Sequence, residues 1–299
     1  MRAALERTLT AAWQRRGPLA VALWPLSRLY GALAARRQAR AVPQRLPVPV
    51  IVIGNVVAGG AGKTPATLAV AQHLLARGWR PGIVSRGHGR ASRACLPVQV
   101  APCRAEAGRA LLAAHPQVNI LLCDDGLQHH ALARDVEICV FDGRGIGNGW
   151  LLPAGPLREA WPRPVSLALF TEGRISLAAA ELPCPAFAAT RRLASSACRA
   201  NGQGVPLARL RGQSVVALAG IARPQAFFDM LRAEGLTLAR TIALPDHAPL
   251  KRLPPLPPQE AALPLLCTEK DAAKLWPHAP QALAAMPFRA CLRPPAARS

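Results

Sequence analysis

The stretch that most constrains the fold is a glycine-rich segment, GNVVAGGAGKTPATLAVAQHLLARG, which runs from Gly54 to Gly78. An apolar run, LPVPVIVI, precedes it and is typical of a buried strand, and apolar side chains recur at helical spacing after Lys63. A strand, a glycine-rich turn, Gly-Lys-Thr and a helix, in this order, are the parts of a phosphate-binding loop (P-loop). Backbone N–H groups of such a loop point at phosphate oxygens, and the positive end of the helix assists them. The segment therefore predicts a nucleotide-binding α/β fold.

Two side chains of this loop carry the expected chemistry. Lys63 is expected to reach the β- and γ-phosphates, and the Thr64 hydroxyl to bind Mg²⁺. The general motif has glycine five residues before Gly62, where this chain has Val57, and two adjacent glycines later in the loop supply the turn instead. The residues predicted to contact the nucleotide are Val57, Ala58, Gly59, Gly60, Ala61, Gly62, Lys63 and Thr64.

Two carboxylates, Asp124 and Asp125, follow the apolar run VNILLC, which predicts a buried strand. A carboxylate in this position next to a phosphate-binding loop orients Mg²⁺ or its water. The alternative is a solvated turn closed by Gly126, but the combination with the glycine-rich loop favours the metal role.

Strand-like and helix-like segments alternate along the rest of the chain. Near-continuous apolar runs predict a mostly parallel sheet with helices on both faces, of the P-loop type. Strand–turn–helix patterns at 214–235 and 263–276 predict a smaller α/β domain. We therefore divide the chain into an N-terminal membrane-associated helix (1–38), a P-loop domain (39–200) and a smaller α/β domain (201–299).

Residues 18–35 form a mostly apolar stretch flanked by arginines, with Arg28 near its middle. A charge at that depth makes a bilayer crossing costly, and no signal-peptide cleavage site follows. Trp24, Tyr30 and the flanking arginines are typical of a helix that lies in the headgroup region of an anionic membrane. An ordinary buried helix is the alternative.

The excess of basic residues points to an acidic counterpart. The chain has 37 Lys and Arg against 16 Asp and Glu, a formal net charge of +21. Anionic lipid, a phosphorylated substrate and nucleic acid all fit this charge, but no nucleic-acid-binding motif accompanies it, so we predict no nucleic-acid partner. The eight cysteines include no C-x-x-C pair, which argues against a zinc site and favours a reducing cytosol.

Further motifs extend the pattern: GIVSRGHGR, DDGLQHHALARDVEICVFD and GIGNGWLLPAGPLRE, followed by GIARPQAFF, LPDH and TEKDAAK. In this order, with the glycine-rich loop, they resemble the tetraacyldisaccharide 4'-kinase family over residues 23–274. The resemblance implies transfer of the γ-phosphate of ATP to the 4'-position of a tetraacyldisaccharide 1-phosphate, which forms lipid IVA in lipid A biosynthesis. It also implies ATP and Mg²⁺ as cofactors, a glycolipid and an anionic membrane surface as partners, and a location at the cytoplasmic face of the inner membrane of a Gram-negative bacterium. It indicates no protein partner.

The resemblance also implies roles for individual residues. Asp124 and Asp125 would serve Mg²⁺, Gln128 and Glu269 would lie near the nucleotide, and His247 would assist catalysis together with Lys63. The residues implied at the acceptor are Arg86, His129 and Arg158. Structural salt bridges are the alternative for the two arginines.

One motif of the family is missing. The family pairs the histidine with an aspartate from a Gly-Asp-Glu-Pro stretch, and this chain has no aspartate between Gly89 and Asp124. Glu106 is the only acid in that interval and begins a predicted helix, where a carboxylate favours the helix dipole. An alternative function is therefore a catalytically weakened or inactive member that binds nucleotide and acidic lipid.

A different enzyme class is a P-loop ATPase or GTPase that acts as a membrane-associated switch. Such an enzyme would hydrolyse nucleotide whether or not glycolipid is present. GTP specificity usually comes with an Asn-Lys-x-Asp motif, and its absence from the sequence disfavours a GTPase.

Overall fold

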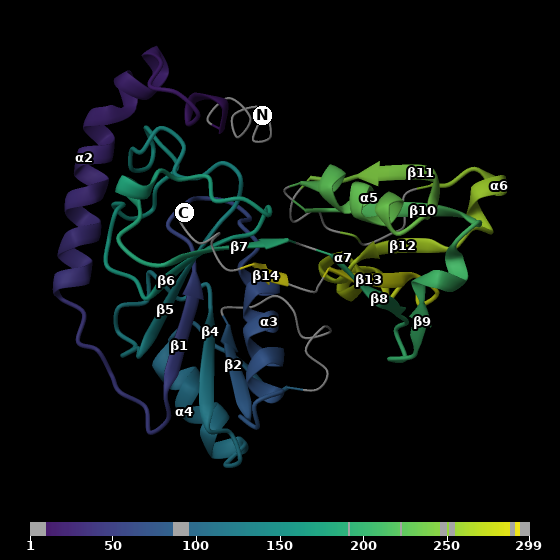
Figure 1. Ribbon diagram of the computed structural model, residues 1–299, viewed down its shortest axis with the longest axis horizontal. Coiled ribbons are helices and arrows are strands. Elements are labelled where there is room, and N and C mark those ends of the chain that lie inside the picture. Colours follow the sequence, from purple (N-terminus) through teal and green to yellow (C-terminus); the bar gives the residue numbers. More distant parts are fainter. Residues whose placement is uncertain are drawn as a thin grey trace, which may run out of the picture. The chain divides into compact units, whose positions relative to one another are not determined.

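The computed structural model describes residues 10–85, 96–190, 192–221, 223–245, 250, 255–287 and 291–293 (Figure 1). These residues fall into two compact units. The first unit contains 10–85, 96–190 and 291–293, and the second contains the described residues from 192 to 287.

Within the described residues, the first unit is built on an eight-stranded sheet in the order β14-β7-β6-β5-β1-β4-β2-β3. Neighbouring strands run parallel, except that β14 pairs antiparallel with β7. The strands are β1 (Val50–Gly54), β2 (Pro81–Ser85), β3 (Val98–Val100), β4 (Ile120–Asp124), β5 (Val136–Phe141), β6 (Leu167–Phe170), β7 (Ala186–Thr190) and β14 (Cys291–Arg293). The helices are α2 (Pro18–Ala39), α3 (Lys63–Leu75), α4 (Arg104–Ala114) and the short 3₁₀ helix η1 (Ala179–Glu181).

The central strands are apolar along their length because helices cover both faces of the sheet. All five residues of β4 are buried. Helix α3 follows β1 and leads past β4 to β2, whereas α4 follows β3 and leads back to β4. Since parallel crossovers are right-handed, connections that run in opposite directions place their helices on opposite faces. The prediction of a mostly parallel sheet with helices on both faces is confirmed.

An aromatic cluster supports the end of β5. Phe141 is fully buried, its ring stacks on Phe170 with the centroids 5.2 Å apart, and it meets Trp161 edge-on at 4.9 Å. Such pairs contribute beyond the area that they bury. The cluster therefore fixes the strand end from which the segment after Phe141 begins.

Replacement of this ring is expected to destabilise the protein. Phe141→Ala removes both ring contacts and leaves a cavity, so the free energy of unfolding should fall by about 3–5 kcal/mol. Urea unfolding followed by circular dichroism measures the change. Phe141→Leu, which refills much of the volume, is the matched control and should cost clearly less; equal losses for both variants would contradict this account of the cluster.

The second unit is a smaller α/β layer with a six-stranded sheet, in the order β11-β10-β12-β13-β8-β9, within the described residues. Strands β11, β10, β12 and β13 are parallel, and β8 and β9 add an antiparallel edge. Its strands are β8 (Leu193–Cys198), β9 (Gly204–Pro206), β10 (Ser214–Ala219), β11 (Thr237–Ala243), β12 (Leu265–Thr268) and β13 (Leu283–Pro287). Its helices are η2 (Leu207–Leu210), α5 (Pro224–Ala233), α6 (Pro258–Ala261) and α7 (Glu269–Leu275).

The predicted domain boundaries at residues 38 and 200 stay a prediction. Two strands pair in a different unit from the one to which these boundaries assign them. Strand β8 precedes residue 200 but pairs with β13 in the second unit. Strand β14 lies near the end of the chain but pairs with β7 in the first unit, where it covers the edge that β7 would otherwise leave open.

Helix α2 packs against the first unit by specific hydrogen bonds. The Ser27 hydroxyl donates to the carbonyl of Leu151 at 2.8 Å and accepts from the amide of Ala154 at 2.9 Å. The Tyr30 hydroxyl donates to the carbonyl of Arg158 at 3.0 Å. Figure 1 shows α2 in purple beside the teal segments that follow β5.

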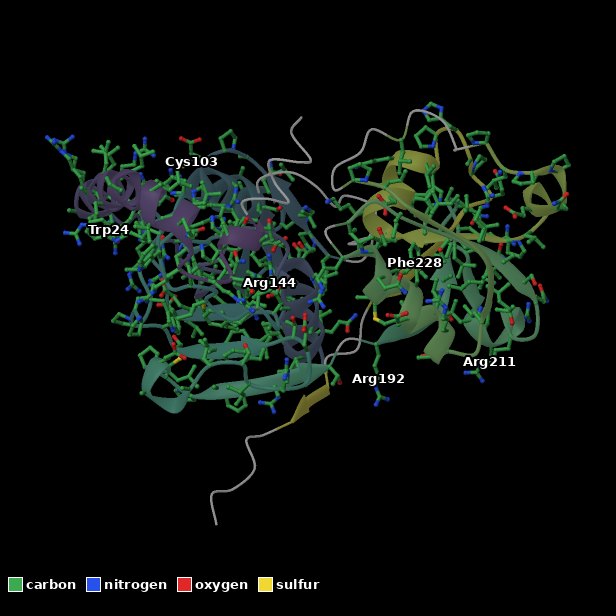
Figure 2. All side chains as sticks on the ribbon, turned by 90° about the horizontal axis from the view of Figure 1, so that it is seen from above. Trp24, Cys103, Arg144, Arg192, Arg211 and Phe228 are labelled. Atoms are coloured by element: carbon green, nitrogen blue, oxygen red, sulfur yellow. The ribbon has the colours of Figure 1, made fainter. Side chains whose placement is uncertain are left out.

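Helix α2 also exposes large apolar side chains to solvent. Its exposed large side chains are Leu19, Val21, Trp24, Leu26, Leu29 and Leu33, and Figure 2 labels Trp24 on this helix. In the part of the chain that the structure describes, no helix has both the length and the apolar content needed to cross a membrane.

Candidate phosphate-binding site

The glycine-rich loop connects β1 to α3 at the carboxyl end of the parallel strands, the edge at which ligands bind in open α/β sheets. Gly59 (φ 104°) and Gly62 (φ 86°) lie in the left-handed region that favours glycine. Gly62 caps α3, so no side chain of the cap occupies the N–H groups of the first helical turn. These N–H groups, with the positive end of α3, form a site for an anion.

Hydrogen bonds from distant segments hold the loop in place. The Ala58 amide donates to the carbonyl of Pro156 at 2.7 Å, and the Thr171 hydroxyl donates to the carbonyl of Ala61 at 3.2 Å. Val57 is buried and forms an antiparallel bridge with Leu157. Among the described non-glycine residues only Asp125 has a positive φ, so Val57 takes a conformation that needs no glycine. The departure from the general motif is therefore accommodated by packing.

Asp124 joins the end of β4 to the first turn of α3. Its carboxylate is buried and accepts hydrogen bonds from the Thr64 hydroxyl at 2.9 Å and from the Thr67 hydroxyl at 3.3 Å. A hydroxyl and a carboxylate are oxygen ligands of the kind that Mg²⁺ takes, so the donor set fits this ion. In the described residues, no group of three or more His, Cys, Asp or Glu side chains is placed to hold a metal ion, so Thr64 and Asp124 would bind it together with the phosphates.

Behind Asp124, a buried arginine that the sequence patterns did not single out completes the strand end. Arg104, the first residue of α4, is only 2% exposed. Its guanidinium donates to the carbonyl of Ala101 at 3.0 Å and lies 3.4 Å from the carbonyl oxygen of Asp124. It adds positive charge beneath the two carboxylates.

Asp125 places two cations side by side at the loop. Its carboxylate accepts from Arg158 Nη2 at 3.0 Å and lies 3.7 Å from Lys63 Nζ. Burial opposes its ionisation, but Lys63 and Arg158 outweigh burial and hold the pKa of Asp125 below its ordinary value. Burial, with the nearby Arg158, lowers the pKa of Lys63 although Asp125 opposes the change. Lys63 Nζ also donates to the carbonyl of Gly59 at 3.3 Å, so it points into the loop.

Asn55 is a second residue that the sequence reasoning missed. It follows β1 directly, is fully buried, and donates to the carbonyl of Val57 at 2.6 Å. Its own carbonyl accepts from Gln128 Nε2 at 3.0 Å and from Arg158 Nη2 at 2.8 Å, and its side-chain oxygen also contacts Arg158 Nη2. In the sequence, only the position of Asn55 between the apolar strand and the glycines could have indicated its role. Asn55 ties both predicted residues to the loop.

The segment GIGNGWLLPAGPLRE lies between the glycine-rich loop and α2. Pro156 and Leu157 contact the loop as described above, and the Arg158 amide donates to the carbonyl of Val56 at 2.6 Å. Ser27 and Tyr30 of α2 bond to the other side of the same segment. The segment thus supports the phosphate loop and carries α2.

The predicted site residues are only partly brought together. The first unit places Lys63, Thr64, Asp124, Asp125, Gln128 and Arg158 around the loop, and His129 directly follows Gln128. Glu269 begins α7 in the second unit. Arg86 and His247 lie outside the described residues.

This strand–loop–helix unit, with Lys63 and Thr64 at the start of α3 and Asp124 at the end of the adjacent strand, defines a P-loop protein. The chain belongs to the tetraacyldisaccharide 4'-kinase family, because the family model LpxK, described as tetraacyldisaccharide-1-P 4'-kinase, matches residues 19–96 and 91–299.

Individual relatives agree with this assignment. The chain is 54% identical to the tetraacyldisaccharide 4'-kinase of Acidovorax sp. (strain JS42), over 94% of this chain and 89% of that protein. It is 44% identical to the protein of the same name from Dechloromonas aromatica (strain RCB), over 90% and 89%. A crystal structure of LpxK from Aquifex aeolicus in complex with ATP shares the fold, with a TM-score of 0.73, 24% identity, and coverage of 92% of this chain and 95% of that one.

The same comparisons bear on the missing Gly-Asp-Glu-Pro stretch. The family match is divided in two at residues 91–96, within the interval that lacks an aspartate. The alignment with the Acidovorax protein covers 312 positions, more than the 299 residues of this chain, so that relative carries residues that this chain lacks. The chain is therefore a family member with a shortened segment before β3.

Proposed function

We propose that this protein is an ATP-dependent kinase that transfers the γ-phosphate to the 4'-position of a tetraacyldisaccharide 1-phosphate and so forms lipid IVA in lipid A biosynthesis. One observation carries the proposal: the phosphate loop, with Thr64 bonded to Asp124 and Lys63 beside Asp125, is complete in a chain that is 54% identical to a protein of that name. The relatives give no support to an inactive member.

The residues of the first unit have separable roles in this proposal. The loop N–H groups and Lys63 bind the phosphates of ATP, and Gln128 and Asn55 hold the loop beside them. Thr64 and Asp124 hold Mg²⁺, with Asp125 nearby, and this ion supplies charge neutralisation on the phosphates when bound. Phosphoryl transfer needs mainly such positioning and charge stabilisation.

The acceptor side of the proposal rests on the family motifs. Arg86, His129 and Arg158 are proposed to bind the glycolipid, and Arg158 is the one whose described position, beside Lys63 and Asp125, supports this. His247 is proposed to assist removal of the proton from the sugar hydroxyl, and Glu269 to approach the nucleotide.

Release of ADP separates a kinase from a membrane-associated ATPase. We expect the protein to release ADP from Mg-ATP only when disaccharide 1-phosphate lipid is present in mixed micelles. ADP release at the same rate without the lipid would instead support a hydrolytic switch.

We also propose that the protein lies at the cytoplasmic face of the inner membrane of a Gram-negative bacterium, without a nucleic-acid or protein partner. The exposed apolar side chains of α2 and the net charge of +21 suit a helix in the headgroup region of an anionic membrane. Basic Arg36 and Arg37 lie in the last turn of α2, where they add attraction to anionic lipid.

A charge on the outer side of α2 is expected to weaken this binding. Leu29 is 59% exposed, and Leu29→Glu replaces its burial in lipid with a carboxylate that anionic lipid repels. Partition onto vesicles of phosphatidylglycerol and phosphatidylethanolamine, measured by sedimentation, should fall about tenfold or more. Val42→Glu, a similarly exposed position beyond the end of α2, is the matched control. Equal partition of both variants would count against a lipid-facing helix.

A further inference from the structure

A further arginine, Arg144, faces the glycine-rich loop from the segment that follows β5; Figure 2 labels it in the first unit. A Cβ placed on Gly59 would lie 3.2 Å from Arg144 Nη1 and 3.3 Å from Nη2. The guanidinium therefore packs directly on Gly59. A side chain at position 59 would displace it, in addition to the strain of a φ of 104°.

Asp142 fixes the orientation of this guanidinium. Its carboxylate is 3% exposed and accepts from Arg144 Nη2 at 2.7 Å and from Nε at 3.0 and 3.1 Å. It also accepts from the backbone amide of Arg144 at 3.0 Å. These bonds engage Nε and Nη2 along one edge of the guanidinium, whereas Nη1 lies 3.2 Å from the position of a Cβ on Gly59. The stacked ring of Phe141 directly precedes Asp142 and supports it from the core.

Arg144 and Lys63 meet at the same glycine. Lys63 Nζ contacts the carbonyl oxygen of Gly59, and the Arg144 guanidinium lies where a Cβ of that residue would point. Lysine in this motif reaches the β- and γ-phosphates, so phosphates bound there also lie within the field of Arg144. A planar guanidinium held along one edge presents its remaining N–H groups in a fixed fork that matches phosphate oxygens.

We propose that Arg144 contacts the terminal phosphates of the bound nucleotide and stabilises the charge that develops on the transferred phosphoryl group, and that Asp142 is its positioning residue. The inference rests on the proposed kinase function and adds a residue to it. An arginine supplied by the same chain plays this part in some P-loop enzymes. The competing explanation is a salt bridge that only shapes the turn after β5.

Nucleotide affinity and turnover distinguish the two explanations. Arg144→Gln should weaken binding of Mg-ATP about tenfold, since a charge-assisted contact is lost, and lower kcat by about 10²–10³-fold. Binding of Mg-ADP should change much less. Isothermal titration with each nucleotide and the glycolipid-dependent assay measure these effects. Arg232→Gln, which breaks an exposed arginine–aspartate pair at 2.9 Å, is the matched control and should leave all three values unchanged.

Two further variants test the positioning. Arg144→Lys keeps the positive charge without the planar guanidinium and should recover part of the ATP affinity. If a thermal melt shows that Arg144→Gln is unfolded, Arg144→Lys tests in its place whether Arg144 contacts the nucleotide. Asp142→Asn keeps Arg144 but loosens it, so kcat should fall while the affinity for ATP changes less. A turn-shaping salt bridge predicts instead lowered thermal stability with ATP affinity and kcat intact.

These experiments distinguish failure of the Arg144 proposal from failure of the kinase proposal. If the wild-type protein binds ATP but transfers no phosphate, the kinase proposal fails, and the ATP–ADP difference in Arg144→Gln and Arg144→Lys still decides the role of Arg144. If the wild-type protein is a kinase and folded Arg144 variants match it in ATP affinity and kcat, the inference is overturned. Failure of the wild-type protein to bind ATP would overturn both.

Discussion

Lys63→Ala is expected to lower glycolipid-dependent kcat/KM by about 10³-fold, in line with the loss of a preorganised charge at a transferred group. Lys63 begins α3 and points at Gly59 from within the loop, so no neighbouring lysine of the described residues can replace it. In this variant, Asp125 still pairs with Arg158 but no longer has Lys63 beside it. The protein should stay folded, because the loop itself is held by the hydrogen bond from the Ala58 amide to the Pro156 carbonyl and by the Thr171 hydroxyl, which donates to Ala61.

Initial rates at several ATP concentrations, together with ATP binding by titration, measure this effect. Lys274→Ala, a lysine in the last turn of α7, is the matched control and should retain activity. Unaltered ATP affinity and turnover in Lys63→Ala would show that the phosphate loop neither binds ATP nor takes part in transfer.

The second large effect is expected for Asp124→Asn. The amide keeps the shape of the carboxylate and an acceptor for the Thr64 hydroxyl, but it removes the negative charge next to the proposed Mg²⁺ site. We expect kcat to fall by about 10²–10³-fold and the Mg²⁺ concentration for half-maximal activity to rise at least about tenfold. A Mg²⁺ titration of activity at saturating ATP tests both numbers.

Asp229→Asn is the control for this experiment, because Asp229 is exposed and its carboxylate accepts only surface hydrogen bonds from Arg232 and Gln225 among the described contacts. It should change neither value. If Asp124→Asn showed the same Mg²⁺ dependence as the wild-type protein, the carboxylate at the end of β4 would have no part in holding the ion. Urea unfolding of Asp124→Asn shows whether any loss of activity reflects unfolding.

Local patterns predicted the centre of the site because its parts are close in the sequence or lie at one sheet edge. The order of strand, glycines, Lys63 and helix is contiguous, and Asp124 ends an apolar run. The carboxyl ends of adjacent parallel strands meet at one edge, so Asp124 had to lie beside Thr64 once β1 and β4 were neighbours. The pairing of β1 with β4 itself was not predictable from either run alone.

The residues that the sequence did not indicate depend on contacts between distant segments. Arg144 reaches Gly59 only because β5 is adjacent to β1 in the sheet, and nothing in its own surroundings marks it except a preceding aspartate. Strand β14 is too short for a recognisable sequence pattern, and its partner β7 is far away in the sequence, so neither the strand nor its pairing could be predicted. The role of Pro156 and Leu157 as supports of the loop likewise became visible only with the fold.

Val57 shows how a mismatch to a motif is resolved by structure. The motif asks for glycine where backbone conformation or close approach excludes a side chain, and Val57 meets neither condition, since its side chain is buried and its backbone pairs with Leu157. The left-handed positions of this loop are Gly59 and Gly62, of which Gly62 is the motif's own glycine. A substitution that departs from a motif therefore weakens the motif only at positions where the conformation requires glycine.

Transfer of labelled phosphate to the lipid decides whether this protein is a 4'-kinase. Purified protein is incubated with γ-labelled ATP, Mg²⁺ and disaccharide 1-phosphate lipid in detergent micelles, beside Lys63→Ala, and the position of the label on the lipid is determined. We expect label at the 4'-position with the wild-type protein and none with Lys63→Ala. Unlabelled lipid from a wild-type protein that binds ATP would contradict the kinase proposal.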